Sequence, residues 1–157
     1  MRREKRVWIY AGLGVPQGTA LVRKGPVGPP AGGLRILLAG REEAQGLVAP
    51  LARLASDAGV SLRVDHRPGT TARDWADNPW LSQHLLTFRP TAVFFVADPS
   101  DVAAARKLAA IVARAGVPLL WLTPGPSTAK GALSVPARDL TASGYAAWAG
   151  QAWAMVR

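Results

Sequence analysis

Four acidic side chains stand beside apolar segments or predicted helix starts, where they could act together. They are Glu42, Asp98, Asp101 and Asp139. Converging carboxylates bind a divalent cation or work as an acid and base pair. A second explanation needs no ligand, because the helix dipole stabilises an acidic residue at a helix start by about 0.3–1 kcal/mol. The second explanation fits Asp98 and Asp101 better, since both precede a predicted helix.

The segment 34–40 is the element that would bring these side chains together. It reads Leu-Arg-Ile-Leu-Leu-Ala-Gly, follows a segment rich in proline and glycine, and precedes an amphipathic helical pattern. Such a run is typical of the central strand of a parallel sheet that helices cover on both faces. In these sheets ligands bind at the carboxyl ends of the strands, where the strand order reverses. Gly40, Arg41 and Glu42 are therefore expected at that edge.

Strands alternate with helices through the rest of the chain, which predicts a three-layer α/β/α sandwich with a parallel sheet. We expect further strands over 60–64, 91–97 and 118–122, and helices over 47–58, 80–88, 101–115 and from Thr141 onward. Pro50 lies inside the first helical pattern and is expected to kink that helix or delay its start. Ser100 is the expected N-cap of the third helix. Segments 67–71 and 123–138 are expected to be loops.

Taken together, these junctions resemble the SGNH (GDSL-type) hydrolase family over roughly residues 34–157. Segment 36–47 is similar to the family's first strand and nucleophile turn, and 69–71 to its glycine block. Segment 93–101 is similar to the strand that leads to its asparagine block, and 139–145 to the segment that carries its histidine. The resemblance implies a flavodoxin-like sheet whose first strand lies between the second and third. Segments 34–39 and 93–97 should then be neighbouring parallel strands.

The residues that this family uses for catalysis are replaced here. Glu42 stands at the position of the nucleophilic serine, and Ser100 at that of the oxyanion asparagine. Pro136 and Asp139 stand at the positions of the catalytic aspartate and histidine, and only the glycine, Gly69, is kept. A serine esterase needs an activated hydroxyl, a base within reach and donors aimed at the oxyanion. We therefore expect Glu42, Ser100 and Asp139 to lie close together without forming a catalytic relay.

Histidines and tryptophans outside these blocks are interpreted as structural. His66 and His84 do not align with the family's catalytic histidine, so each is expected to be a surface or hydrogen-bonded residue. Most tryptophans fall on helix or strand faces and are expected in the core. Trp75 and Trp80 bracket a loop-like stretch and are the better interface candidates, although packing is the commoner role.

Residues 1–33 are expected to be a basic arm in front of an α/β domain over 34–157. Of the net charge of +9, the first 35 residues carry +6. Segments 7–11 and 19–24 are expected to be strands too short to be stable alone. We expect them to complete a neighbour's sheet, or alternatively to add an edge to their own. The candidate contact residues are Arg2, Arg3, Lys5, Arg6, Trp8, Tyr10, Arg23 and Lys24.

Composition excludes several classes of site. The chain has 157 residues, enough for one domain with a core, and its lack of cysteine excludes disulfides and thiolate metal sites. No apolar run approaches the ~18 residues that span a bilayer, and the basic start lacks the long apolar stretch of a signal peptide. No cofactor is predicted. The compartment stays open between the cytoplasm and a virion.

Three functions follow from these observations. The first is a non-catalytic structural or interaction module, attached by its arm to a larger assembly such as a virion or tail complex. Its partner would be another protein or a second copy of this chain. The second is an esterase or deacetylase with an altered, carboxylate-based site. The third is nucleic-acid binding through the basic arm, with Trp8 and Tyr10 stacking on bases.

Overall fold

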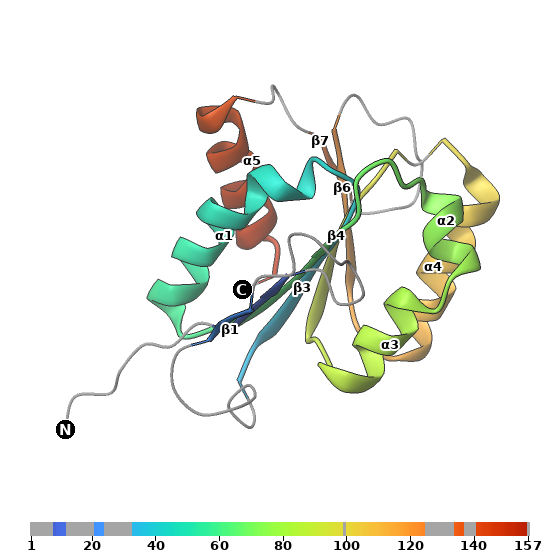
Figure 1. Cartoon of the computed structure of the whole chain (residues 1–157), viewed down its shortest axis with the longest axis horizontal. Helices are drawn as coiled ribbons and strands as arrows, with labels where there is room; N and C mark the ends of the chain where they lie inside the picture. Colours follow the sequence, from blue (N-terminus) through green and yellow to red (C-terminus); the bar gives the residue numbers. More distant parts are fainter. Residues whose placement is uncertain are drawn as a thin grey trace.

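The fold is built on one sheet with helices on both of its faces (Figure 1). The computed structural model describes residues 8–11, 21–23, 33–98, 100–124, 134–136 and 141–156. Within them the strand order is β2-β1-β4-β3-β5-β6-β7. Six of these strands run parallel to one another: β1 (Trp8–Ala11), β3 (Arg35–Gly40), β4 (Ser61–His66), β5 (Ala92–Val96), β6 (Leu119–Thr123) and β7 (Ser134–Pro136).

The centre of the sheet has the predicted arrangement. Strand β3 lies between β4 and β5, and Leu38 is paired with Val64 on one side and with Phe94 on the other. All three side chains are fully buried. The order β4-β3-β5-β6 is that of flavodoxin-like sheets, in which the first strand of the α/β unit lies beside the reversal of strand order. The predicted α/β/α class and the neighbouring parallel strands are confirmed.

The alternation of side chains along the strands creates two separate cores. Leu38 and Phe94 pack under α1 (Ala44–Ala58) and α5 (Ala142–Ala154). Leu37 and Phe95 face the other way and pack with residues of α2 (Ala72–Asp77), α3 (Trp80–Thr87) and α4 (Val102–Arg114). Figure 1 shows these two helical layers on opposite sides of the sheet. None of the helices in the described part of the chain is long and apolar enough to cross a membrane.

Helix α1 differs from the expected helix at its start. It begins at Ala44 and runs through Pro50 to Ala58, so the late start does not occur. Pro50 removes one hydrogen bond from the helix. The apolar stripe of Ala44, Leu47, Leu51 and Ala55 is buried along its whole length, and this packing outweighs that loss. Gly59 ends the helix in the left-handed conformation, with φ of 70°, as its residue type predicts.

Helix α2 was not predicted, because segment 72–77 is short and follows a loop. Its start is held by a reciprocal pair of hydrogen bonds. The N–H of Thr71 donates to Asp74 Oδ2 over 2.8 Å, and the N–H of Asp74 donates to Thr71 Oγ1 over 3.3 Å. This capping box satisfies two backbone donors that would otherwise lack partners. The loop over 67–71 that precedes the helix is as predicted.

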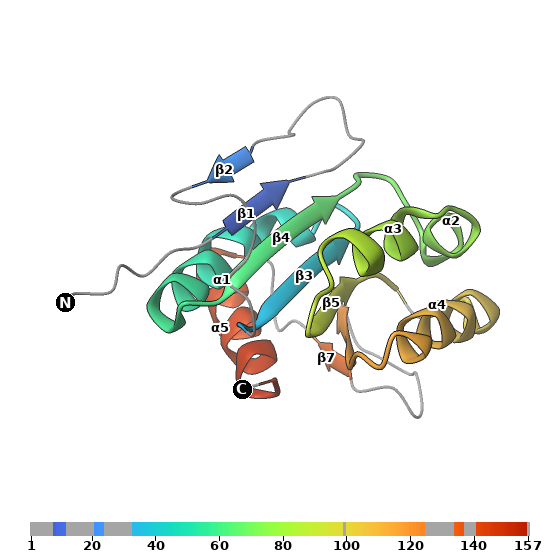
Figure 2. The same cartoon turned by 90° about the horizontal axis from the view of Figure 1, so that it is seen from below.

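The two strands of the arm join the sheet of their own chain. Strand β1 (Trp8–Ala11) lies parallel to β4, and β2 (Leu21–Arg23) lies antiparallel to β1 (Figure 2). The structure therefore shows the alternative expectation, an added edge on the chain's own sheet, and not the first one, pairing with a neighbour's sheet. Without β1, the backbone of β4 would be an open edge with unpaired N–H and C=O groups. Other arm residues named above lie outside the described part: Arg2, Arg3, Lys5, Arg6 and Lys24.

Candidate functional site

The carboxyl end of β3 passes unusually close to β5. Gly40 has φ of 132°, and a Cβ atom on it would overlap the backbone carbonyl of Val96. The next N–H, that of Arg41, donates to the Val96 oxygen over 3.0 Å. Only glycine fits such an approach. The result is a sharp exit from the sheet that places Arg41 and Glu42 at its carboxyl edge.

Glu42 is held by Gly69 and Arg41. The N–H of Gly69 donates to Glu42 Oε2 over 2.9 Å, and Arg41 Nη2 donates to Glu42 Oε1 over 3.0 Å. The same guanidinium donates from Nε to Glu43 over 2.7 Å. The Gly69 N–H is the first cause of a lowered Glu42 pKa, and Arg41 adds to it. This edge of the sheet therefore holds an ionised carboxylate.

Ser100 is exposed and makes no hydrogen bond to Glu42 within the described residues. Its N–H donates to Asp98 Oδ1 over 3.0 Å. The expected N-cap role of Ser100 is wrong: the cap of α4 is Asp101, whose Oδ1 accepts the N–H of Ala104 over 3.1 Å. Because Asp98 and Ser100 form a turn, the N-cap of α4 falls one residue later than expected, on Asp101.

Asp101 also pairs with a cation on the neighbouring helix. Its two oxygens accept from Arg73 Nε and Nη2 over 2.8 and 3.1 Å. Arg73 is the first cause of a lowered Asp101 pKa. Within the described residues no group of three His, Asp or Glu side chains is arranged to hold a metal ion. Pro136 is the last residue of β7, and Asp139 lies outside the described residues, so its predicted proximity to Glu42 stays a prediction.

A buried polar cluster, which sequence reasoning missed, lies between β4 and α3. Asp65 is fully buried and His84 is 2% exposed. His84 Nε2 and Asp65 Oδ2 are 2.7 Å apart, and Arg67 Nη2 donates to the same oxygen over 3.0 Å. On the other side of the ring, Arg63 Nη1 lies 3.4 Å from His84 Nδ1 and donates to Thr87 Oγ1 over 2.9 Å. We call Arg63, Asp65, Arg67 and His84 the β4–α3 cluster.

Aromatic rings enclose this cluster. The guanidinium of Arg67 lies 4.1 Å from the ring centre of Trp80 and 5.5 Å from that of Trp75. The guanidinium of Arg63 lies 4.7 Å from the centre of Phe88. These are cation–π distances, and such contacts strengthen away from water. The only trace of this cluster in the sequence is the alternation of polar Ser61, Arg63 and Asp65 along β4. The same alternation is typical of a strand face exposed to solvent, so it does not indicate a buried cluster.

The structure agrees with some of the predicted roles of the tryptophans and histidines and not with others. Trp75 is buried, and its Nε1 donates to Thr70 Oγ1 over 3.0 Å, so it is a core residue and not an exposed interface residue. Trp80 is half-buried against it, with ring centres 5.1 Å apart. The interpretation of His84 as a hydrogen-bonded residue is confirmed. His66 is half-buried, and its Nδ1 has no hydrogen-bond partner.

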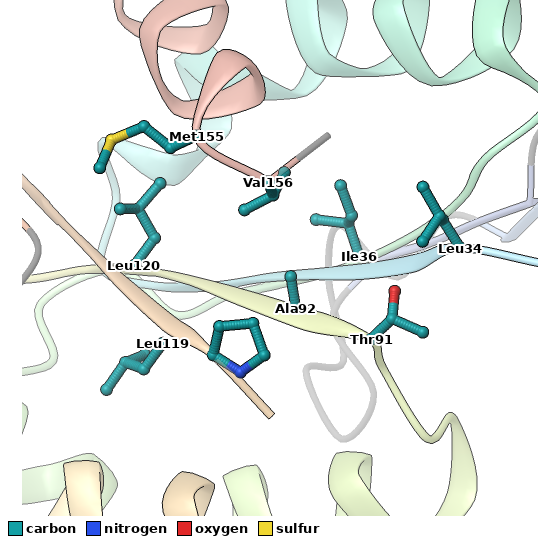
Figure 3. A pocket seen from close by; sticks show the side chains of 9 residues that line it. Leu34, Ile36, Thr91, Ala92, Leu119, Leu120, Met155 and Val156 are labelled. Atoms are coloured by element: carbon teal, nitrogen blue, oxygen red, sulfur yellow. The ribbon is translucent and has the colours of Figure 1, made fainter. Parts of the chain in front are cut away.

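One hollow in the described part lies at the amino ends of β3, β5 and β6 (Figure 3). Its volume is about 200 Å³, below the ~300–1,000 Å³ of typical small-molecule sites. Because its lining is mostly apolar and comes from the amino ends of the strands, it offers no acid, base or nucleophile. Lining side chains include Leu34, Ile36, Ala92, Leu120, Met155 and Val156.

Comparisons with known proteins give no family. No family model matches the chain, and no curated protein is similar to it. Among solved structures, the sugar isomerase domain of an RpiR transcription factor from Sphaerobacter thermophilus is 18% identical, with a TM-score of 0.49 over 79% of this chain and 70% of that one. A LacI family transcriptional regulator from Weissella paramesenteroides with bound glucose is 14% identical (TM-score 0.47) over 66% of this chain and 36% of that one. A 3-dehydroquinate dehydratase-like protein from Bifidobacterium longum is 16% identical, with a TM-score of 0.45.

Proposed function

We propose that this chain is a catalytically inactive SGNH-like domain that serves as a structural or protein-interaction module. The observation that supports it is the hydrogen bond from the Gly69 N–H to Glu42 Oε2, 2.9 Å long. In acyl-transfer enzymes, backbone N–H groups stay open to receive the oxyanion of the transition state. Here a carboxylate of the same chain accepts the bond, and its lowered pKa keeps it charged.

Carboxylate-based hydrolysis has less support. Two carboxylates acting as acid and base need different environments and a shared substrate position. Asp101 is engaged by Arg73 and by the α4 backbone. Asp65 is fully buried beside His84 and Arg67. Two of the carboxylates that could work with Glu42 are therefore engaged elsewhere, and Asp98 Oδ1 already accepts the N–H of Ser100.

An assay of the full chain on short-chain esters and acetylated sugars tests the loss of catalysis. Three proteins are compared: wild type, Glu42→Gln, and Glu43→Gln as the matched control. Glu43 is the adjacent acid and also pairs with Arg41, but it does not bind Gly69. None of the three should hydrolyse any substrate above the buffer rate. Turnover that Glu42→Gln abolishes and Glu43→Gln retains would overturn the proposal.

The interaction role is tested through the charges of the arm. A full-length variant with Arg2, Arg3, Lys5 and Arg6 changed to Glu should lose association, measured by light scattering for self-association and by titration with an acidic protein. The control reverses exposed cations elsewhere, at Arg53, Arg106 and Arg114, and should associate like wild type. Equal association of both variants would contradict a role for the arm. Tight binding of single-stranded DNA that weakens steeply with salt would favour the nucleic-acid function instead.

A further inference from the structure

The β4–α3 cluster fixes the proton position on His84. A guanidinium has only donors, so Arg63 Nη1, 3.4 Å from His84 Nδ1, requires a lone pair on that nitrogen. The ring proton is then on Nε2, which donates to Asp65 Oδ2 over 2.7 Å. In this tautomer His84 accepts from a cation on one side and donates to an anion on the other.

The charges around His84 leave no place for a second ring proton. Arg63 and Arg67 bring two positive charges to the cluster, and Asp65 brings one negative charge. Arg67 already pairs with the Asp65 oxygen that His84 contacts. Apolar residues of β3, α2 and α4 pack in the core on this face of the sheet, among them Leu37, Trp75 and Leu108. A proton on Nδ1 would therefore face a guanidinium in a buried, weakly screening environment.

His84 is also a main anchor of α3 on the sheet. The helix has eight residues, and Leu81 and His84 are its buried side chains. The carbonyl of His84 accepts the N–H groups of Phe88 and Arg89 over 2.9 and 3.3 Å, which closes the end of the helix. Leu86, on the outer side of α3, is 76% exposed. A helix this short, with few apolar anchors, depends on the polar contact beneath it.

We propose that His84 is an acid-sensitive docking point for α3. At neutral pH the ring joins α3 to β4 through Asp65 and Arg63. When Nδ1 takes up a proton, the ring and the Arg63 guanidinium repel each other, and α3 separates from β4. The device uses neither Glu42 nor Gly69 and does not depend on the proposed function.

Hydrogen exchange of the full chain tests this proposal. Exchange of a peptide covering 80–88 is measured at about pH 7.5 and pH 5.5 and corrected for the intrinsic pH dependence of exchange. We expect α3 to open at least about threefold more at the lower pH, since one linked proton gives at most a tenfold change per pH unit. His84→Gln should abolish the difference. His66→Gln, which removes the only other histidine, should retain it.

A second measurement applies even if His84→Gln fails to fold. With two histidines in the chain, the ring nitrogen shifts in a ¹⁵N NMR spectrum of the wild type can be assigned using His66→Gln. At about pH 7.5 they should show the His84 proton on Nε2, the tautomer that leaves Nδ1 free to accept from Arg63. An Nδ1-protonated or doubly protonated ring at that pH would overturn the proposal. An unchanged pH effect in His84→Gln, or none in the wild type, would overturn it as well.

Discussion

Gly40 lies against Val96 so closely that the backbones of β3 and β5 leave no room for a Cβ atom between them. The N–H that follows, on Arg41, is bonded to the Val96 carbonyl. Gly40→Ala forces the two central strands apart and holds alanine at φ of 132°. We expect a loss of about 2–4 kcal/mol in the free energy of unfolding, measured by urea denaturation.

Gly59 provides the matched control for this substitution. It also has a positive φ, of 70°, but a Cβ atom there would meet nothing within 4 Å. Gly59→Ala should therefore cost only the backbone strain, about 1 kcal/mol. Equal losses in the free energy of unfolding for the two variants would show that the close approach of β5 adds nothing to the cost of Gly40→Ala.

Asp65→Asn removes the only negative charge of the β4–α3 cluster. Arg67 and His84 then lose their ionic partner inside the core. Breaking a buried ion pair by neutralising one side costs about 3–5 kcal/mol. Asp77→Asn is the comparison, because its 3.7 Å pair with Lys107 is exposed and should change stability by less than about 0.5 kcal/mol. Thermal unfolding followed by circular dichroism measures both, and a small effect of Asp65→Asn would contradict this account of the cluster.

Arg89→Gly should stabilise the protein. Arg89 follows α3 with φ of 53°, the only positive φ of a non-glycine residue in the described part of the chain. Its side chain is exposed, so little packing is lost with it. Glycine removes the steric cost of this conformation, and part of that gain is offset by a more flexible unfolded chain. We expect a net gain of about 0.5–1 kcal/mol and no gain for Arg89→Ala.

The contribution of Glu42 to stability should depend on pH. Its pKa in the folded protein is lowered, first by the Gly69 N–H, so the folded state favours the ionised form. This stabilisation is present above the ordinary value of 4.5 and is lost as the pH falls through the lower folded pKa. Because the side chain is 46% exposed, the effect is below about 1 kcal/mol. The Tm difference between wild type and Glu42→Gln should shrink between about pH 6 and pH 3; a difference that grows would contradict the assignment.

Backbone exchange tests the place of β1 in the sheet. Ile9, Tyr10 and Ala11 are paired with Leu62, Arg63 and Val64 of β4, and β3 pairs with the other side of β4. In a parallel ladder successive amides point to opposite neighbours, so both partners are needed to protect them all. NMR of the full chain should show slow exchange for all three β4 amides. Rapid exchange at alternate positions would mean that β1 does not cover this edge.

Much of the sheet could be predicted from the sequence, and the reason is visible in β5. The run Ala92–Val96 is buried at every position, as expected for a central parallel strand. Its continuous apolar pattern therefore predicts this strand directly. Strand β4 alternates instead, and the pattern of Arg63 and Asp65 predicts a polar face in solvent. The structure buries that face under α3, because the charges pair with each other and with His84. Pairing of this kind depends on residues about 20 positions apart and leaves no periodic signal.

The functional role of the predicted site residues stays a prediction, and only some of their contacts can be compared with the structure. The blocks that carry Glu42 and Gly69 do meet at the carboxyl edge, as the order of the elements implied. The N-cap of α4 fell on Asp101 because Ser100 and Asp101 are both good capping residues, and the local turn decides between them. The pairing of β1 could not be predicted from the arm alone. It depends on which edge of the assembled sheet is open, and the sequence of the arm does not show that.

The position of β1 has a consequence for how the chain is made. On the ribosome the N-terminal segment emerges first, yet Ile9 is paired with Leu62, which is synthesised much later. Strand β4 must also settle against β3 before the edge that receives β1 exists. Strand β1 therefore leaves the ribosome before β4 but joins the sheet only after it. Until then it is an exposed β-prone segment, and a second nascent chain could pair with it.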